Sequence, residues 1–221
     1  VEFVNSSIVL PKTILRCCSC HLLANFISAI DRKPSRDSRN CFAPGRFTVT
    51  LFLARPPPGY HEPVSTPVHI AFLGCGFITG VHSRHLKQLG DAVICSYASR
   101  DGAKAERYRR QHLGHAHYAS YASALEDPSV DAVVIAVPPK FHLDLTLQAL
   151  AARKHVLVEK PAFLTIRDFQ TVQAARERND RIVLVGENDH YKPLAVCLRR
   201  LLHEGVIGDL LMAHFTTLLR R

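Results

Sequence analysis

The feature that most constrains the fold is a regular alternation of short apolar runs with amphipathic stretches across residues 67–185. Runs that are apolar along their whole length indicate strands buried on both faces, and helices between them indicate parallel strands joined by crossovers. The predicted strands are 68–73, 92–98, 132–137, 155–158 and 182–185, and the predicted helices are 82–89, 104–112, 120–126, 141–152, 166–178 and 194–203. Because such crossovers are right-handed, the predicted fold class is α/β, with a doubly wound parallel sheet.

Residues 1–66 have a different character. Six prolines stand in 31–66 among serine, arginine and asparagine residues, and each proline removes a backbone donor and fixes φ. We therefore expect an irregular, disordered extension over 1–66 that does not belong to the folded unit, with 46–53 as a short strand.

The cysteines give little indication of a metal site. Four of the seven stand in the first 41 residues. The segment CCSCH at 17–21 lacks the second ligand pair that a structural zinc site needs, so we expect free thiols and no metal. The odd cysteine count, with Cys75 and Cys95 inside predicted buried elements, indicates a reducing compartment. We expect a cytoplasmic protein.

The formal charge of +9 is spread along the chain. Residues 1–66 hold 8 Lys and Arg against 4 Asp and Glu, and residues 67–221 hold 20 against 15. There is no block of like charges and no basic stripe rich in aromatic residues, so we do not expect nucleic acid as a partner. No stretch reaches the roughly eighteen apolar residues that span a bilayer, so we expect no membrane partner either.

The first predicted strand runs into Gly74-Cys75-Gly76, which opens a predicted helix. Gly74 allows a tight turn, and Gly76 lets the backbone approach a pyrophosphate at the helix N-terminus, next to Phe77 and Ile78. Two close glycines can also mark an ordinary turn, and Thr79 replaces the usual small third residue. The strand before and the helix after favour the dinucleotide-binding arrangement of a Rossmann domain.

The choice between NAD and NADP is made at the end of the second strand in such a domain. An acidic side chain there holds the ribose hydroxyl of NAD, whereas this chain has Ser99-Arg100-Asp101. Serine can donate to a phosphate, and the planar guanidinium of Arg100 can pair with it. We predict NADP as the cofactor. Asp101 leaves NAD open, and Arg100 could also be a solvated residue at a helix start.

The segment VLVEKP at 156–161 completes a set of motifs. The others are Gly74, Gly76, His82, the turn 136–139 and His142. Together they resemble the Gfo/Idh/MocA oxidoreductases over residues 67–215, about two thirds of the chain. The resemblance implies a sugar or polyol substrate and a lysine, Lys160, close to the nicotinamide. It also implies that Pro138, His142 and Glu159 belong to the cofactor site.

The physical chemistry of Lys160 agrees with that resemblance. Open α/β sheets bind ligands beyond the carboxyl ends of their strands, where Lys160 is expected to project. Pro161 restricts the backbone of Lys160 to extended conformations. A lysine held there can carry the hydroxyl proton while hydride moves to the cofactor. The alternative is a surface lysine at a strand end.

Other positions match the family less closely. The family commonly has Thr-Pro-Asn where this chain has Val-Pro-Pro at 137–139, so the usual asparagine is absent. His142 stands at the start of a predicted helix, which indicates a structural role rather than catalysis. The turn after the last predicted strand carries Asn188, His190 and Tyr191, which could contact substrate or be ordinary surface residues.

The segment 205–209 resembles the family's entry into a second domain. We expect a dinucleotide-binding domain over 67–187, followed in 188–221 by a linker helix and the first strand, 210–219, of an incomplete substrate domain. The sheet of that domain, when complete, would pair copies of the chain into a homo-oligomer. One alternative is a module that binds NADP without turnover. Another is a methyltransferase that uses S-adenosylmethionine, since those also have a glycine-rich first turn.

Overall fold

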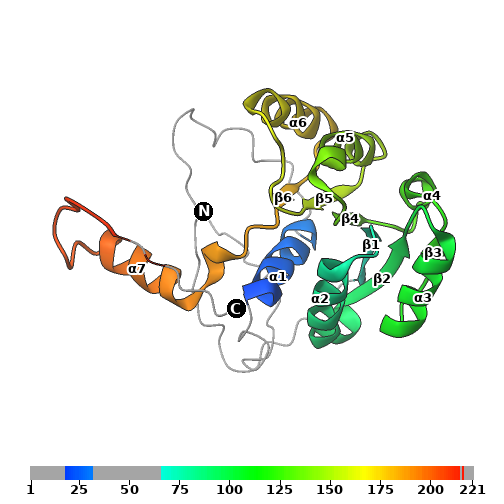
Figure 1. The fold of residues 1–221 in the computed structure, drawn as a ribbon, viewed down its shortest axis with the longest axis horizontal. Helices are drawn as coiled ribbons and strands as arrows, with labels where there is room; N and C mark the ends of the chain where they lie inside the picture. The colour runs from blue at the N-terminus through cyan, green and yellow to red at the C-terminus, as the bar shows by residue number, and fades with distance from the viewer. Residues whose placement is uncertain (1–17, 32–65, 215, 217–221) are drawn as a thin grey trace, which may run out of the picture.

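The computed structural model describes residues 18–31, 66–214 and 216, and its centre is a parallel sheet of six strands (Figure 1). The strands are β1 (Val68–Leu73), β2 (Val93–Ala98), β3 (His117–Tyr118), β4 (Ala132–Ile135), β5 (His155–Val158) and β6 (Val183–Val185). Their order is β3-β2-β1-β4-β5-β6. This is the doubly wound order of a dinucleotide-binding fold, with its switch point between β1 and β4. The predicted α/β class is confirmed.

The register of the strands places their carboxyl ends at one edge of the sheet. Leu73 at the end of β1 pairs with Ala98 of β2 and with Ile135 of β4. Ile135 in turn pairs with Val158 of β5, which pairs with Val185 of β6. The segments that follow five of the strands therefore begin side by side, although they are far apart in sequence.

Two helical layers cover the sheet. The helices on one face are α1 (Cys18–Asp31), α2 (Phe77–Leu86) with the 3-10 turn η2 (Lys87–Ala92), and α3 (Gly102–His112). Those on the other are α4 (Tyr121–Glu126), α5 (His142–Ala151) and α6 (Ile166–Asn179). Figure 1 shows α5 and α6 on the opposite side of the sheet from α1 and α2. Side chains alternate along β1, so that Phe72 joins the first layer and Leu73 the second.

The predicted elements correspond closely to the observed ones, with two exceptions inside the domain. Helix α2 begins at Phe77 rather than at 82, because the buried residues of its first turn are Thr79 and Gly80, which do not show the apolar periodicity on which the prediction rested. Strand β3 was not predicted, since its two residues are too short to show an apolar run. It is held by pairing with the end of β2.

The prediction that residues 1–66 are irregular and lie outside the folded unit is wrong for α1. Leu22, Leu23, Phe26 and Ile27 are 0–2% exposed and pack in one cluster with residues of β1, α2 and β4. They form one face of the helix, at the spacing expected for a helix that packs on a core. The proline-rich part, residues 32–65, and residues 1–17 lie outside the described residues, as does the strand predicted over 46–53.

The final part of the chain is only partly as predicted. After the 3-10 turn η4 (Asp189–Tyr191), the linker helix is present as α7 (Pro193–His203), and none of its residues is buried. The strand predicted over 210–219 is not formed in 210–214, the continuous part of it that is described. A strand needs a neighbour that satisfies its backbone groups, and no described strand pairs with this segment.

The packing of α1 leads to a test of whether it belongs to the folded unit. Phe26→Ala removes a fully buried ring, so we expect the free energy of unfolding to fall by about 3–5 kcal/mol. Urea denaturation of the whole chain measures this. The matched control is Phe77→Ala, because Phe77 is 84% exposed and its loss is expected to cost less than about 0.5 kcal/mol. Equal stability of the two variants would place α1 outside the cooperative unit.

Candidate cofactor and active site

The turn after β1 requires a glycine at position 74 because of the surrounding protein atoms. Gly74 has φ of +110°, and a Cβ there would lie 2.4 Å from the carbonyl oxygen of Ala136. Its N–H donates to the carbonyl of Ala98 at 2.9 Å, and its own carbonyl accepts from the Thr79 hydroxyl at 2.7 Å. Thr79 is completely buried, and this hydrogen bond satisfies its hydroxyl, so the position accommodates a residue larger than glycine. The turn thus joins the ends of β1, β2 and β4.

Gly76 is different, because no atom of the described chain requires a glycine there. A Cβ at Gly76 would meet nothing within 4 Å, and its φ of −110° is open to any residue. It caps α2 without a side-chain hydrogen bond, so the first N–H groups of the helix, beginning at Phe77 and Ile78, lack intrahelical partners. Open space before an uncapped, electropositive helix start is the arrangement that binds a pyrophosphate. A dinucleotide fits here.

The end of β2 presents a hydroxyl and a cation. Ser99 is buried, and its Oγ accepts from the N–H of Asp101 at 3.2 Å. The Asp101 carboxylate accepts from the N–H of Lys104 at 3.2 Å and so caps α3. Arg100 is exposed, and its guanidinium lies 5.6 Å from the centre of the Phe141 ring. The acidic side chain of this segment is therefore engaged by a helix, whereas the basic one is accessible.

Glu159, the residue before Lys160, is buried. Its Oε1 lies 2.5 Å from Nε2 of His82, and its Oε2 accepts from the N–H of Lys160 at 3.2 Å. Gly186 leaves the room for it, since a Cβ there would lie 3.1 Å from Oε1. Both carboxylate oxygens are thus used within the protein. The geometry gives Glu159 a positioning role, and its cofactor contact stays a prediction.

Lys160 follows β5 and is exposed at the carboxyl edge of the sheet. The Lys160–Pro161 peptide bond is cis. A hydrogen bond from Lys192 lowers the pKa of the Asp189 carboxyl, and the nearby charge of Lys160 contributes to the same shift. The charge of Lys160 therefore acts on the turn after β6, and the substrate contact of that turn stays a prediction.

His142 connects two loops of the site. Its Nδ1 lies 3.0 Å from the carbonyl oxygen of Pro161 and 3.1 Å from that of Ala162, and its Nε2 lies 2.8 Å from that of Val137. The ring is 1% exposed. Because both nitrogens face backbone carbonyls, His142 holds the loop after β4 against the loop after β5. It does not offer the cofactor contact that the sequence predicted, whereas Pro138, on the same loop, is exposed.

The three predicted substrate residues have different surroundings. Asn188 is half-buried, and its Oδ1 has no hydrogen-bond partner within the described residues. The Tyr191 ring packs against the core cluster that contains α1, and burial raises the pKa of its hydroxyl. The side chain of His190 lies outside the described part of the chain. Asn188 thus has a buried side-chain oxygen without a partner in the described part of the chain, and its substrate contact stays a prediction.

Sequence reasoning did not single out several residues that shape the site. The Tyr108 hydroxyl donates to the carbonyl of Gly76 at 3.0 Å, and His82 joins α2 to Glu159. His82 had been noticed only as part of the family pattern. Tyr108 lies within a charged helix and gave no indication of its role. Lys140 was noticed only as a departure from the family's turn, and its ammonium lies 5.0 Å from the centre of the Phe141 ring.

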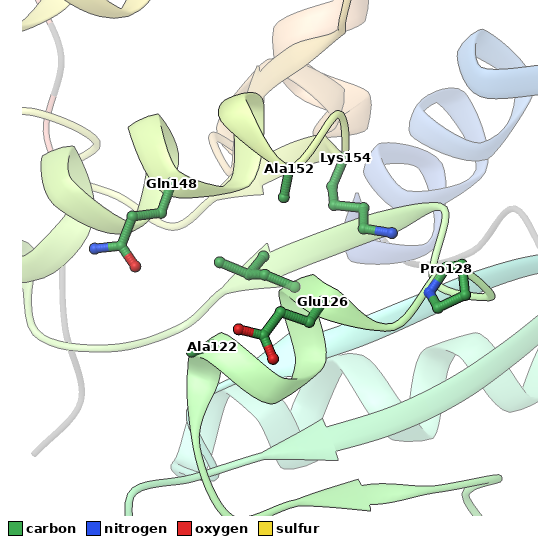
Figure 2. Close-up of a pocket in the computed structure, with 7 residues that line it drawn as sticks. Ala122, Glu126, Pro128, Gln148, Ala152 and Lys154 are labelled. Atoms are coloured by element: carbon green, nitrogen blue, oxygen red, sulfur yellow. The ribbon is translucent and has the colours of Figure 1, made fainter.

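A separate hollow of about 530 Å³ lies away from these residues, between α4 and α5 (Figure 2). It is lined by Ala122, Leu125, Glu126, Pro128, Gln148, Ala152 and Lys154. Pro128 and Lys154 precede β4 and β5, so the hollow opens near the amino ends of those strands. The Lys154 ammonium is already engaged, donating to the Asp127 carbonyl at 2.7 Å. None of the predicted site residues lines it.

Two further observations concern only the described residues. No three His, Cys, Asp or Glu side chains among them are grouped so that they could hold a metal ion. No helix in residues 18–31 or 66–214 is long and apolar enough to cross a bilayer.

Comparison with known proteins assigns the domain. A family model described as GFO_IDH_MocA, an oxidoreductase family with an NAD-binding Rossmann fold, matches residues 68–187. The chain belongs to this family. Residues 68–187 are thus a Rossmann domain for a nicotinamide cofactor.

Several characterised relatives are similar over the same part of the chain. A dTDP-3,4-didehydro-2,6-dideoxy-alpha-D-glucose 3-reductase of Saccharopolyspora spinosa is 38% identical over 151 residues, which are 65% of this chain and 43% of the relative. A myo-inositol 2-dehydrogenase of Thermotoga maritima is 30% identical over 144 residues, or 64% and 42%. The crystal structure of an NAD binding oxidoreductase from Klebsiella pneumoniae is 27% identical, with a TM-score of 0.60 over 64% of this chain and 40% of that one. The chain therefore spans less than half the length of these relatives.

The two glycines of the first turn give a matched pair of variants. Gly76→Ala places a methyl group in open space, so we expect stability within about 1 kcal/mol of the parent but at least a tenfold loss of NADPH affinity. Gly74→Ala forces a side chain to φ of +110° against Ala136, so we expect it to lower the free energy of unfolding by about 2 kcal/mol or more. NADPH fluorescence titration and urea denaturation measure the two effects. Unchanged affinity in Gly76→Ala would show that the cofactor does not approach this turn.

Proposed function

We propose that the chain is the cofactor-binding part of an oxidoreductase that transfers hydride between NADP and a hydroxyl or carbonyl carbon of a sugar or polyol. The observation that carries the proposal is the position of Lys160, exposed at the same sheet edge as the uncapped start of α2. The names of two relatives, a deoxysugar-nucleotide reductase and an inositol dehydrogenase, support the substrate class.

The residues of the site divide into binding, positioning and proton-transfer groups. The open backbone at Gly76 and the first turn of α2 bind the pyrophosphate. Glu159 and His142 fix the loop that carries Lys160. When bound, the nicotinamide supplies the acceptor or donor of hydride. Lys160 then takes the proton of the substrate hydroxyl in oxidation, or returns it in reduction. Asn188, whose buried Oδ1 has no hydrogen-bond partner in the described residues, is the residue that we assign to orienting the substrate.

The preference for NADP follows from the end of β2. NAD is held there by an acidic side chain that accepts from the ribose hydroxyls. The Asp101 carboxylate caps α3, so it is engaged by the protein backbone. Ser99 and Arg100 leave a hydroxyl and a guanidinium, the groups that bind a phosphate.

A second candidate function is cofactor binding without turnover. Lys160 is exposed, and the described residues 210–214 are exposed and unpaired. A substrate would need further walls to hold it against Lys160, and orientation supplies several kcal/mol of catalysis, of the order of 7–11 kcal/mol at best. The two candidates share the cofactor site and differ only in turnover.

Arg100→Ala tests the cofactor preference. Removing a charged contact to the 2′-phosphate is expected to weaken NADPH binding by about 1.5–3 kcal/mol and to change NADH binding little. Fluorescence titration with both cofactors measures this. Arg167→Ala, on the exposed start of α6, removes the same charge elsewhere and should change neither affinity. Equal affinity of the parent for NADPH and NADH would contradict the preference.

Lys160→Met tests the catalytic assignment. Polyols and aldoses are assayed with NADP, and we expect the variant to lose at least about a hundredfold in kcat because the proton carrier is gone. Its NADPH affinity should stay within a few-fold of the parent, which separates proton transfer from binding. A variant that retains the parent's rate would remove Lys160 from the mechanism. A parent that binds NADPH but turns over none of these substrates would favour the second candidate.

A further inference from the structure

Four side chains from three loops meet beside the carboxyl ends of β2, β3 and β4. They are Arg100, Tyr121, Lys140 and Phe141, which we call the cation cluster. The Arg100 guanidinium lies 5.6 Å from the centre of the Phe141 ring, and the Lys140 ammonium lies 5.0 Å from the same centre. Burial raises the pKa of the Tyr121 hydroxyl, and the nearby charge of Arg100 opposes that rise. Two cations thus lie near one aromatic ring, and one of them also acts on a tyrosine.

The backbone under Lys140 is rigid. Pro138 and Pro139 precede it, and both have a restricted φ. The 3-10 turn η3 (Pro139–Phe141) is closed by a hydrogen bond from the N–H of Phe141 to the carbonyl of Pro138 at 3.0 Å. His142 then ties the same segment to the loop after β5. The backbone of Lys140 is therefore held in a fixed position, from which its side chain and that of Arg100 at the end of β2 both reach the Phe141 ring.

The two cations have no acidic partner in the described part of the chain. Neither forms an ion pair there, whereas Arg109 and Arg110 of α3 both pair with Glu106. A single cation on an aromatic ring is common. Two like charges near one ring repel each other, and such a concentration of positive charge attracts an anion. Ser99, whose hydroxyl lies at the same strand end, adds a neutral donor.

We propose that Lys140 is a specificity-determining residue, the second cation of a clamp in which Arg100 and Lys140 bind the 2′-phosphate of NADP from opposite loops. This inference rests on the proposed NADP preference. Arg100 supplies a planar guanidinium from the loop after β2, and Lys140 supplies a point charge from the turn after β4. Phe141 keeps the two cations on one side of the adenosine site before the cofactor arrives.

The experiment isolates the phosphate from the rest of the cofactor. The chain contains no tryptophan to report on binding, so calorimetry with 2′,5′-ADP and with 5′-AMP is the measurement of choice. Lys140→Met keeps most of the side-chain length and removes the charge. We expect it to bind 2′,5′-ADP about tenfold more weakly than the parent and 5′-AMP equally well. Lys140→Arg, which keeps the charge, should retain most of the affinity for 2′,5′-ADP.

The controls separate this inference from the proposed function. Lys87→Met removes the same charge from an exposed position near the amino end of β2, and should change neither affinity. The double variant Arg100→Ala with Lys140→Met should bind 2′,5′-ADP no better than 5′-AMP. If the parent prefers 2′,5′-ADP and Lys140→Met keeps that preference, the clamp is wrong and the NADP proposal stands. If the parent shows no preference, the NADP proposal and the clamp are both overturned.

Discussion

The hydrogen bond between His82 and Glu159 is the interaction on which the rest of the site depends. It joins α2, whose start is the proposed phosphate site, to the end of β5, after which Lys160 stands. The two residues are 77 positions apart and both are buried, and a buried hydrogen bond to a charged group contributes about 1.5–3 kcal/mol. Because Glu159 also accepts from the N–H of Lys160, one carboxylate connects α2 with the backbone of Lys160, and so joins the two parts of the proposed site.

The sheet face opposite α5 and α6 is completed by a helix that lies outside the region matched by the family model. The model begins at residue 68, whereas α1 ends at Asp31. Phe26 and its apolar neighbours on α1 nevertheless share a core with β1, α2 and β4, and Tyr191 of η4 packs against the same cluster. The core of this protein therefore extends beyond the family domain and touches the turn that bears the predicted substrate residues.

Most of the fold could be predicted because parallel strands buried on both faces are apolar along their whole length. That pattern is clear in β1, β4 and β5, which match their predicted starts. It is absent from β3, which pairs with the end of β2 and whose Tyr118 hydroxyl donates to Asp127. The failure at α1 has a different cause, because its apolar face is short and stands next to a proline-rich stretch that suggested disorder for the whole region. The proline-rich composition therefore counted for more in the prediction than the helical spacing of a few apolar residues, whose burial is known only from the structure.

The sequence by itself determined the order of strands and helices along the chain, the glycine turn, and the position of Lys160 after an apolar strand. Each of these depends on residues that are close together in the chain. Only the tertiary structure decided what the neighbouring polar groups do. Asp101 caps a helix, Glu159 and His142 hold loops, and Lys140 meets Arg100 across Phe141. Most of these contacts join residues from different loops, brought together by the register of the sheet. A single sequence carries the chemistry of such residues but not the distances between them.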